Sequence, residues 1–189
     1  MRMAVIGPSG SGKTWVSTRL AERLGLRHVE IDALYHGHNW EACTLEELRE
    51  KVAAATEGDG WVSDGTYHQL IGEVVLERAQ TIVWLDLPAR LIQWRLFRRT
   101  YLRKKHRVEL WHGNLEGPWR ESLRFLMWPS FKRSFENRRK LPALFACHSH
   151  LEVHRLRSDR EVRQFVEAWQ PAVVVNSLRS ETSSHTQSA

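Results

Sequence analysis

The residues with the clearest chemistry lie near the start of the chain, at positions 7–14 (GPSGSGKT). Their spacing, G-x-x-x-x-G-K-[ST], is typical of a phosphate-binding loop. Glycine suits such a loop because backbone N–H groups must approach phosphate oxygens where a side chain would collide. The Lys13 ammonium can reach the β- and γ-phosphates, and the Thr14 hydroxyl can ligate Mg²⁺. We therefore predict a site for ATP and Mg²⁺. Its residues are Gly7, Pro8, Ser9, Gly10, Ser11, Gly12, Lys13 and Thr14.

The residues around this loop supply the elements that must position it. Residues 3–6 are apolar and suit a buried strand, and residues 15–24 suit an amphipathic helix with Val16, Leu20 and Leu24 on one face. A helix that begins near Lys13 directs the positive end of its dipole at the same anion. A strand, a glycine loop and a helix in this order turn the motif into a structural prediction.

Three carboxylates are predicted to follow buried strands, at the edge where α/β sheets bind ligands. The strands are predicted at residues 27–32, 61–65 and 81–88, and the carboxylates are Asp32, Asp64 and Asp86. Asp32 is a candidate general base or acceptor-orienting group, with a helix N-cap as the alternative. Asp64 is a candidate to support Mg²⁺. Asp86 is either a second candidate for that role or a helix cap.

The rest of the pattern alternates helices with strands. Helices are predicted at residues 44–56, 69–78, 121–128, 131–145 and 158–169, with a long one from residue 89 and a fifth strand at 150–156. Capping boxes at Thr44–Glu47 and Ser158–Glu161 mark two of the helix starts. This alternation predicts an α/β fold, a three-layer αβα sandwich around five parallel strands with right-handed crossovers.

Composition and length limit the setting. The chain has 189 residues and a net charge of +6, which favours anionic partners. We predict one domain over residues 1–170 and a disordered tail over 171–189, which is rich in Ser and Thr. Cys43 and Cys147 make no disulfide framework, so we expect a cytoplasmic protein, a monomer or homodimer. We expect no signal peptide and no membrane partner, since no stretch approaches about 20 apolar residues.

The basic run at residues 95–107 has three interpretations. It is a lid that clamps the triphosphate, a surface that binds nucleic acid, or a solvated helix face. Trp94, Tyr101 and Trp111 are interleaved with its charges, which suits base stacking as well as packing at a lid hinge.

These segments together resemble the small P-loop kinases of the adenylate-kinase-like group, in particular the adenylate kinase-related proteins that include FlaR-like DNA topology modulation proteins. The resemblance covers about residues 1–170, and its segments are 7–14, 30–35, 61–67, 84–88 and 95–99. It implies a sheet in the order 2-3-1-4-5, a substrate site between strands 2 and 3, and a helical lid at about residues 95–130.

The resemblance also implies roles for single residues. Asp64-Gly65 matches the pair whose carboxylate holds Mg²⁺ through water. Arg95 matches an arginine that packs on adenine and Arg99 one that contacts phosphate, as a planar guanidinium can do. Arg98 and Arg120 are further candidates to stabilise developing charge.

The sequence departs from nucleoside monophosphate kinases where these bind the acceptor's phosphate. Residues 33–48 contain no arginine, and His68 stands where a second arginine is expected. The residues present instead suit a hydroxyl-bearing acceptor, as in shikimate- and gluconate-type kinases. They are Asp32, Tyr35, His36, His38, Trp40, Tyr67 and His68.

The sequence thus predicts a kinase that moves the γ-phosphoryl group of Mg-ATP to a small acceptor, with Lys13, Asp32, Arg95 and Arg99 as the catalytic residues. The alternative is a P-loop ATPase or a nucleotide-regulated nucleic-acid-binding protein. The acceptor stays open. So does the choice between ATP and GTP, although the guanine-reading motif Asn-Lys-x-Asp is absent from the chain.

Overall fold

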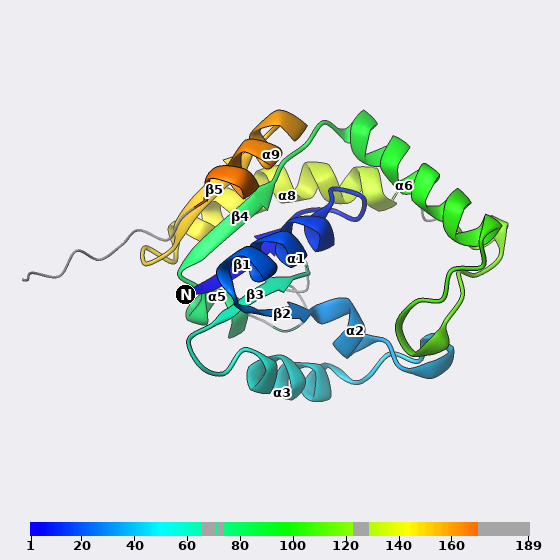
Figure 1. Ribbon diagram of the computed structural model, residues 1–189, viewed down its shortest axis with the longest axis horizontal. Coiled ribbons are helices and arrows are strands. Elements are labelled where there is room, and N and C mark those ends of the chain that lie inside the picture. The colour runs from blue at the N-terminus through cyan, green and yellow to red at the C-terminus, as the bar shows by residue number, and fades with distance from the viewer. Residues whose placement is uncertain (66–70, 72–73, 123–128, 170–189) are drawn as a thin grey trace, which may run out of the picture.

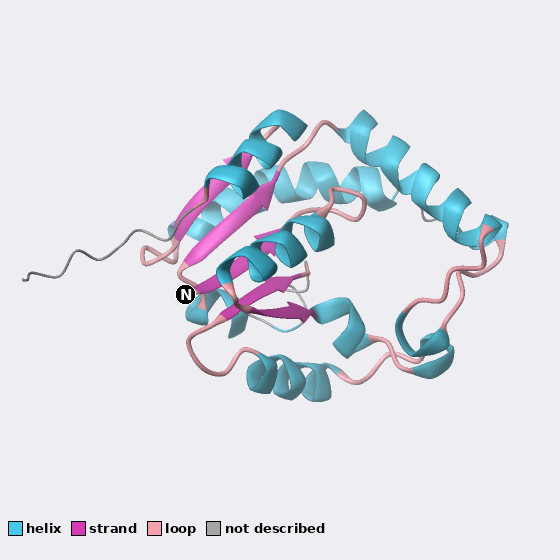
Figure 2. Cartoon of the chain, viewed as in Figure 1, coloured by secondary structure: helices cyan, strands magenta, loops and turns pink. Residues whose placement is uncertain are grey.

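A five-stranded parallel sheet forms the centre of the molecule. The computed structural model describes residues 1–65, 71, 74–122 and 129–169. The strands are β1 (Arg2–Ile6), β2 (Arg27–Glu30), β3 (Trp61–Asp64), β4 (Thr81–Leu85) and β5 (Glu152–Leu156). They pair in parallel in the order β2-β3-β1-β4-β5 (Figures 1 and 2). Both the predicted fold class and the predicted strand order are confirmed.

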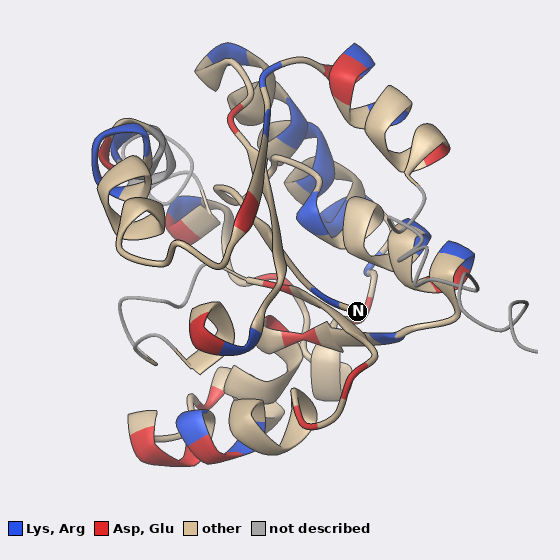
Figure 3. Cartoon of the chain, turned by 90° about the vertical axis from the view of Figure 1, so that its left-hand side faces the viewer, with Lys and Arg blue, Asp and Glu red and all other residues tan. Residues whose placement is uncertain are grey.

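Helices cover both faces of this sheet and make the outer layers. They are α1 (Lys13–Leu24), α2 (Ile31–Tyr35), α3 (Leu45–Ala55), α5 (Val74–Arg78), α6 (Ala89–Lys105), α8 (Pro129–Ala146) and α9 (Asp159–Ala168), with short 3₁₀ turns η1 (His38–Trp40) and η2 (Trp111–Gly113). Charged residues lie mostly on the helices and loops around the sheet (Figure 3). No helix among the described residues is long and apolar enough to cross a membrane.

The alternation of side chains along each strand builds two separate cores. Met3 and Val5 of β1 pack with α1, α9 and the start of α6, whereas Ala4 and Ile6 pack with α3, α5 and α8. Successive strand residues point to opposite faces, and each face of a parallel sheet is covered, so every residue of β4 is buried. The strands are therefore held rigidly, and the ends of β1, β2 and β3 become fixed points for the site.

Four strands are shorter than predicted: β3 by one residue, β2 and β5 by two, and β4 by three, since it ends at Leu85. We expected β2 to run to Asp32, but it ends at Glu30 and α2 begins at Ile31. The cause is the sheet register: Glu30 pairs with Asp64, the last residue of β3, so the following residues have no ladder partner. Ala33 and Leu34 favour a helix instead. Asp32 therefore lies in the first turn of α2, one residue beyond the strand.

The predicted helix boundaries are largely reproduced. The Thr44–Glu47 capping box is complete and opens α3, and Ser158 caps α9 by accepting from the Glu161 backbone N–H. Residues 69–70 and 72–73 of one predicted helix and 123–128 of another lie outside the described residues, as does the predicted tail at 171–189.

Asp86 is the shared partner of two arginines and not a helix cap. The N-cap of α6 is Pro88, and no side chain caps it. Asp86 is buried at the end of β4 and accepts from Arg138 Nε at 2.6 Å and from Arg155 Nη2 at 2.6 Å. The expected helix-cap role is therefore wrong. The carboxylate joins α8 to β5, which a sequence pattern cannot reveal because Arg138 and Arg155 lie far along the chain.

Asp86→Asn should lower the free energy of unfolding by about 2 kcal/mol, because two partly exposed arginines lose the buried anion that they share. Urea denaturation measures this. The matched control is Asp59→Asn, since the side chain of Asp59 is 95% exposed in its pair with Arg2 and should contribute less than about 1 kcal/mol. Equal losses in the two variants would contradict the structural role of Asp86.

Candidate active site

The loop at residues 7–14 joins β1 to α1 and adopts the conformation that its glycines allow. Gly10 and Gly12 have φ angles of 86° and 93°, in the left-handed region that other residues rarely adopt. Gly10 also lies against α6: a Cβ there would be 2.8 Å from the Ile92 carbonyl oxygen. Lys13 begins α1 and its Nζ donates to the Pro8 carbonyl at 3.3 Å, across the mouth of the loop.

A buried hydroxyl at this loop fits an anion ligand. Ser11 is 1% exposed, and among the described residues its Oγ has no hydrogen-bond partner. The Oγ faces Gly7 across the loop, where an added Cβ would approach it to 2.7 Å. A buried polar atom without a partner is costly, and an oxygen of a bound phosphate would satisfy it. The loop therefore fits a phosphate group in both its shape and its unfilled hydrogen bonds.

The carboxylate predicted to support Mg²⁺ lies beside Thr14. Asp64 is 3% exposed, with Ser17 Oγ at 3.1 Å and His28 Nε2 at 3.6 Å. Burial by itself raises the pKa of Asp64, but hydrogen bonds from His28 and Thr14 and the charge of Lys13 outweigh burial and lower the pKa. The same contact with Asp64 raises the pKa of His28. An ionised carboxylate next to a threonine hydroxyl is a donor set that suits Mg²⁺.

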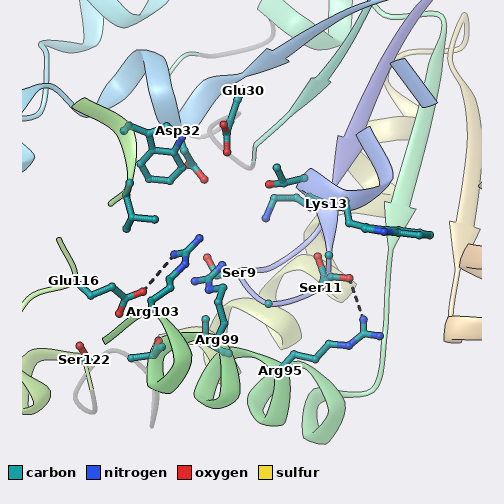
Figure 4. A pocket seen from close by; sticks show the side chains of 18 of the residues that line it. Ser9, Ser11, Lys13, Glu30, Asp32, Arg95, Arg99, Arg103, Glu116 and Ser122 are labelled. Carbon is teal, nitrogen blue, oxygen red and sulfur yellow. Dashed lines mark hydrogen bonds and ion pairs between the residues drawn. The ribbon is translucent and has the colours of Figure 1, made fainter. Parts of the chain in front are cut away.

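A cavity of about 950 Å³ opens in front of the loop. Ser9 to Thr14 form one side, and Arg95, Arg99 and Arg103 of α6 reach in from another. The opposite wall carries the carboxylates of Glu30 and Asp32, so cations and anions face each other across the space (Figure 4). The cavity brings together Lys13, Thr14, Asp32, Arg95 and Arg99 of the predicted site. Asp64 lies next to Thr14 but outside the lining.

Sequence reasoning missed Glu30, which lines the same cavity at the end of β2. Burial raises the pKa of Glu30 most, and the nearby negative charges of Asp64 and Asp32 raise it further, against a hydrogen bond from Trp111. The signal was available in the alternation of β2, where Val29 enters the core and His28 and Glu30 face the other way. Recognising Glu30 from this alternation required knowing that β2 ends at residue 30.

The arginines of α6 differ in their partners. Arg95 pairs with Asp159 of α9 at 2.5 Å, and Arg103 pairs with Glu116 at 3.3 Å. Arg99 makes no hydrogen bond or ion pair with the described residues, and desolvation by the surrounding protein, aided by the charge of Arg103, lowers its pKa to about 10. Of the three α6 arginines that line the cavity, Arg99 is therefore the one whose guanidinium is not paired with a described carboxylate.

The helical period divides the basic run into two faces. Arg95, Arg99 and Arg103 line the cavity, whereas Arg98 and Arg120, proposed as further charge-stabilising residues, lie outside its lining. An outward stripe alternates aromatic and basic side chains, and α6 contains no acidic residue. The stripe consists of Arg90, Trp94, Phe97, Arg98, Tyr101 and Lys105, with Trp94, Phe97 and Tyr101 exposed by 61%, 44% and 45%.

The polar and aromatic residues predicted for the acceptor side are only partly gathered. Tyr35, His36 and Trp40 line the cavity, and Trp111 joins them from the segment after α6. His38 lies outside the lining and contacts His112. Tyr67 and His68 lie outside the described residues.

Comparison with known proteins finds sequence relatives among nucleotide kinases. The chain is 33% identical over 112 residues to a putative adenylate kinase of Thermococcus kodakarensis, covering 56% of this chain and 60% of the relative. It is 26% identical over 85 residues to a cytidylate kinase of an Aster yellows witches'-broom phytoplasma, covering 45% and 33%. The chain thus spans between a third and three-fifths of the length of these relatives. No family model matches it.

The solved structure of shikimate kinase from Bacteroides thetaiotaomicron superposes with a TM-score of 0.53 at 15% identity, covering 88% of this chain and 94% of that one. The fold is that of a P-loop kinase. The resemblance to small adenylate-kinase-like P-loop kinases is confirmed. The Thermococcus protein supports it in sequence, and the Bacteroides shikimate kinase supports it in the fold. The sequence identity to these proteins is too low to define which acceptor this protein would phosphorylate.

Gly10→Ala should weaken binding of a magnesium ATP analogue at least tenfold, because the new Cβ meets a backbone carbonyl and the φ angle is unfavourable. Isothermal titration calorimetry measures the affinity. Gly58→Ala is the matched control: Gly58 has a φ of 83° but nothing lies within 4 Å of its added Cβ. Unchanged affinity in Gly10→Ala would contradict the phosphate-binding role of the loop.

Proposed function

We propose that this protein transfers the γ-phosphoryl group of Mg-ATP to a hydroxyl group of a small acceptor. The supporting observation is the single cavity in which Lys13 and Arg99 face Asp32 and Glu30 (Figure 4). Phosphoryl transfer asks a protein mainly to position its substrates and to neutralise charge. Cations on one side of a cavity and carboxylates on the other meet both demands.

The nucleotide half is formed by the loop, α1 and α6. Backbone N–H groups of residues 10–14 hold the β-phosphate, and Lys13 neutralises charge on the β- and γ-phosphates. Arg95 and Arg99 close over the nucleotide from α6, with Arg95 already braced by Asp159. Thr14 and Asp64 would hold Mg²⁺, which when bound supplies further neutralisation of phosphate charge.

The acceptor half is formed by the end of β2, α2 and the loop after it. Asp32 is the general base that accepts the hydroxyl proton, or the group that orients the hydroxyl. Residues 28–48 contain no Lys and no Arg, so this wall offers no permanent cation to an acceptor phosphate. That composition favours a hydroxyl acceptor over a nucleoside monophosphate, although the sequence relatives are named for adenylate and cytidylate.

The test is a screen of hydroxylated metabolites and nucleoside monophosphates for acceptor-dependent ADP release with Mg-ATP. With the acceptor so found, Lys13→Ala should abolish turnover, because the transferred phosphoryl group loses its main cation. Asp32→Asn should lower kcat by about 100-fold or more, as expected for loss of a general base.

Circular dichroism should show that both variants keep the fold. Glu30→Gln is the matched control for Asp32→Asn, because it neutralises the neighbouring carboxylate on the same wall. Full phosphoryl transfer by Lys13→Ala would refute the mechanism, and an equal loss in Glu30→Gln would remove the assignment of the base to Asp32.

A second candidate function is nucleic-acid binding, and the outward stripe of α6 supports it. Stacked bases need exposed aromatic faces, and the phosphate backbone needs nearby cations. Trp94, Phe97 and Tyr101 provide the first, and Arg90, Arg98 and Lys105 provide the second without any acidic residue on the helix. This surface faces away from the cavity, so it is compatible with the kinase function.

Wild-type protein should bind a 30-nucleotide deoxythymidine strand with an affinity that falls steeply as salt rises, and Trp94→Ala should weaken binding about tenfold through lost stacking. Fluorescence anisotropy measures both effects. Phe135→Ala is the control, since Phe135 is 52% exposed on α8 and not on the helix that carries the stripe. An absence of binding by the wild type near 150 mM salt would eliminate this candidate.

A further inference from the structure

Two segments far apart in the sequence meet at the acceptor side of the cavity. The acceptor loop (residues 36–42) follows α2, and the cover segment (residues 110–117) follows α6. In the ribbon view the chain beyond α6 turns back to lie beside the chain beyond α2, which closes a ring around the site (Figure 1). Both segments contribute to the cavity lining, through His36 and Trp40 on one side and Leu110 and Trp111 on the other.

The side chain of Asn114 joins the two segments. It is 5% exposed, although it belongs to a loop. Its Nδ2 donates to the Gly37 carbonyl at 2.7 Å, and its Oδ1 accepts from the Trp40 backbone N–H at 3.2 Å. Both ends of one amide are therefore satisfied by the main chain of the opposite segment. The Trp40 Nε1 adds a third bond, to the Leu115 carbonyl at 2.8 Å.

The acceptor loop has a backbone conformation that needs such support. Asn39 and Trp40 are consecutive non-glycine residues with φ angles of 54° and 61°. The left-handed region is unfavourable for a side chain as large as tryptophan, and it persists where surrounding contacts hold it. The contacts that hold Trp40 come from Asn114 and Leu115 of the cover segment.

The same contacts shape the wall that an acceptor would meet. Trp111 of the cover segment stacks on His36, with ring centroids 5.9 Å apart and an interplanar angle of 14°, and hydrogen bonds to Glu30. The cover segment is also tied to α6, because Glu116 pairs with Arg103. A continuous chain of contacts therefore runs from the arginine-bearing helix of the nucleotide half to the aromatic wall of the acceptor half.

We propose that Asn114 is a positioning residue that holds the acceptor loop and the cover segment together as one unit, so that the acceptor half of the cavity takes its shape only while the cover segment is docked. The effect on the acceptor rests on the proposed function, whereas the docking of the two segments does not depend on it. Since Arg99 and Arg103 lie on the helix that leads into the cover segment, a nucleotide that steadies α6 also stabilises the docked acceptor loop.

Hydrogen exchange of the full chain, read in peptides that cover residues 36–42, tests this docking with and without magnesium and a non-hydrolysable ATP analogue. In the wild type the analogue should slow exchange in these peptides. Asn114→Ala should speed their exchange at least tenfold, and the analogue should no longer slow it. Because coupling is reciprocal, the affinity for the analogue should fall by no more than the factor by which the analogue slows exchange in the wild type. Trp40→Phe loses one hydrogen bond, to Leu115, and keeps an aromatic ring beside His36 and Trp111, so it should speed exchange by a smaller factor.

Glu109→Gln is the control, because Glu109 is exposed at the start of the same loop and makes no hydrogen bond or ion pair with the described residues. Unchanged exchange of residues 36–42 in Asn114→Ala would overturn the proposal. Faster exchange throughout the sheet of Asn114→Ala would also overturn it, because that indicates a general loss of stability. The same holds if the analogue slows exchange in Asn114→Ala as much as in the wild type.

The proposal also predicts a separation of kinetic constants. With the acceptor from the screen, Asn114→Ala should raise the acceptor KM about tenfold and change the nucleotide affinity by a smaller factor, and an unchanged acceptor KM would overturn it. If the screen finds no acceptor, the proposed function fails, whereas the exchange experiment still decides whether Asn114 couples the two segments.

Discussion

The site depends on how closely a backbone can approach an anion. Phosphate oxygens must reach a ring of N–H groups at hydrogen-bond distance, so the chain between β1 and α1 cannot carry Cβ atoms where the ring turns inward. Gly10 shows the constraint most directly, since its position is closed on the other side by the Ile92 carbonyl. The first turn of α6 therefore packs against the loop, and this packing brings the arginines of α6 to the phosphate site.

Charge is arranged around that loop with a clear division. Lys13 of α1 and Arg95, Arg99 and Arg103 of α6 line the cavity, and the carboxylates of Glu30, Asp32 and Asp64 lie at the ends of β2 and β3 and in the first turn of α2. Parallel strands make this division simple, because their carboxyl ends meet at one edge. Ion pairs keep some cations in place before any ligand arrives, as Asp159 does for Arg95, while Arg99 keeps its hydrogen-bonding capacity.

The acceptor side is built on a different principle. Its wall consists of short turns and aromatic rings, held by a few hydrogen bonds between the acceptor loop and the cover segment. Such an assembly has a smaller buried core than the sheet and opens more easily. Under the proposed function, a rigid nucleotide half and an adjustable acceptor half suit a fold that serves different acceptors.

The sequence by itself determined whatever depends on local pattern. Glycine spacing located the loop, apolar runs located the strands, and the Thr44–Glu47 capping box located the start of α3, because neighbouring residues decide each of these. Tertiary structure decided which charges meet. The end of β2 at Glu30 depends on pairing with Asp64, Asp86 depends on Arg138 and Arg155, and Trp40 depends on Asn114. Each partner lies more than 30 residues away, and local periodicity records only that a residue is buried, not what it touches.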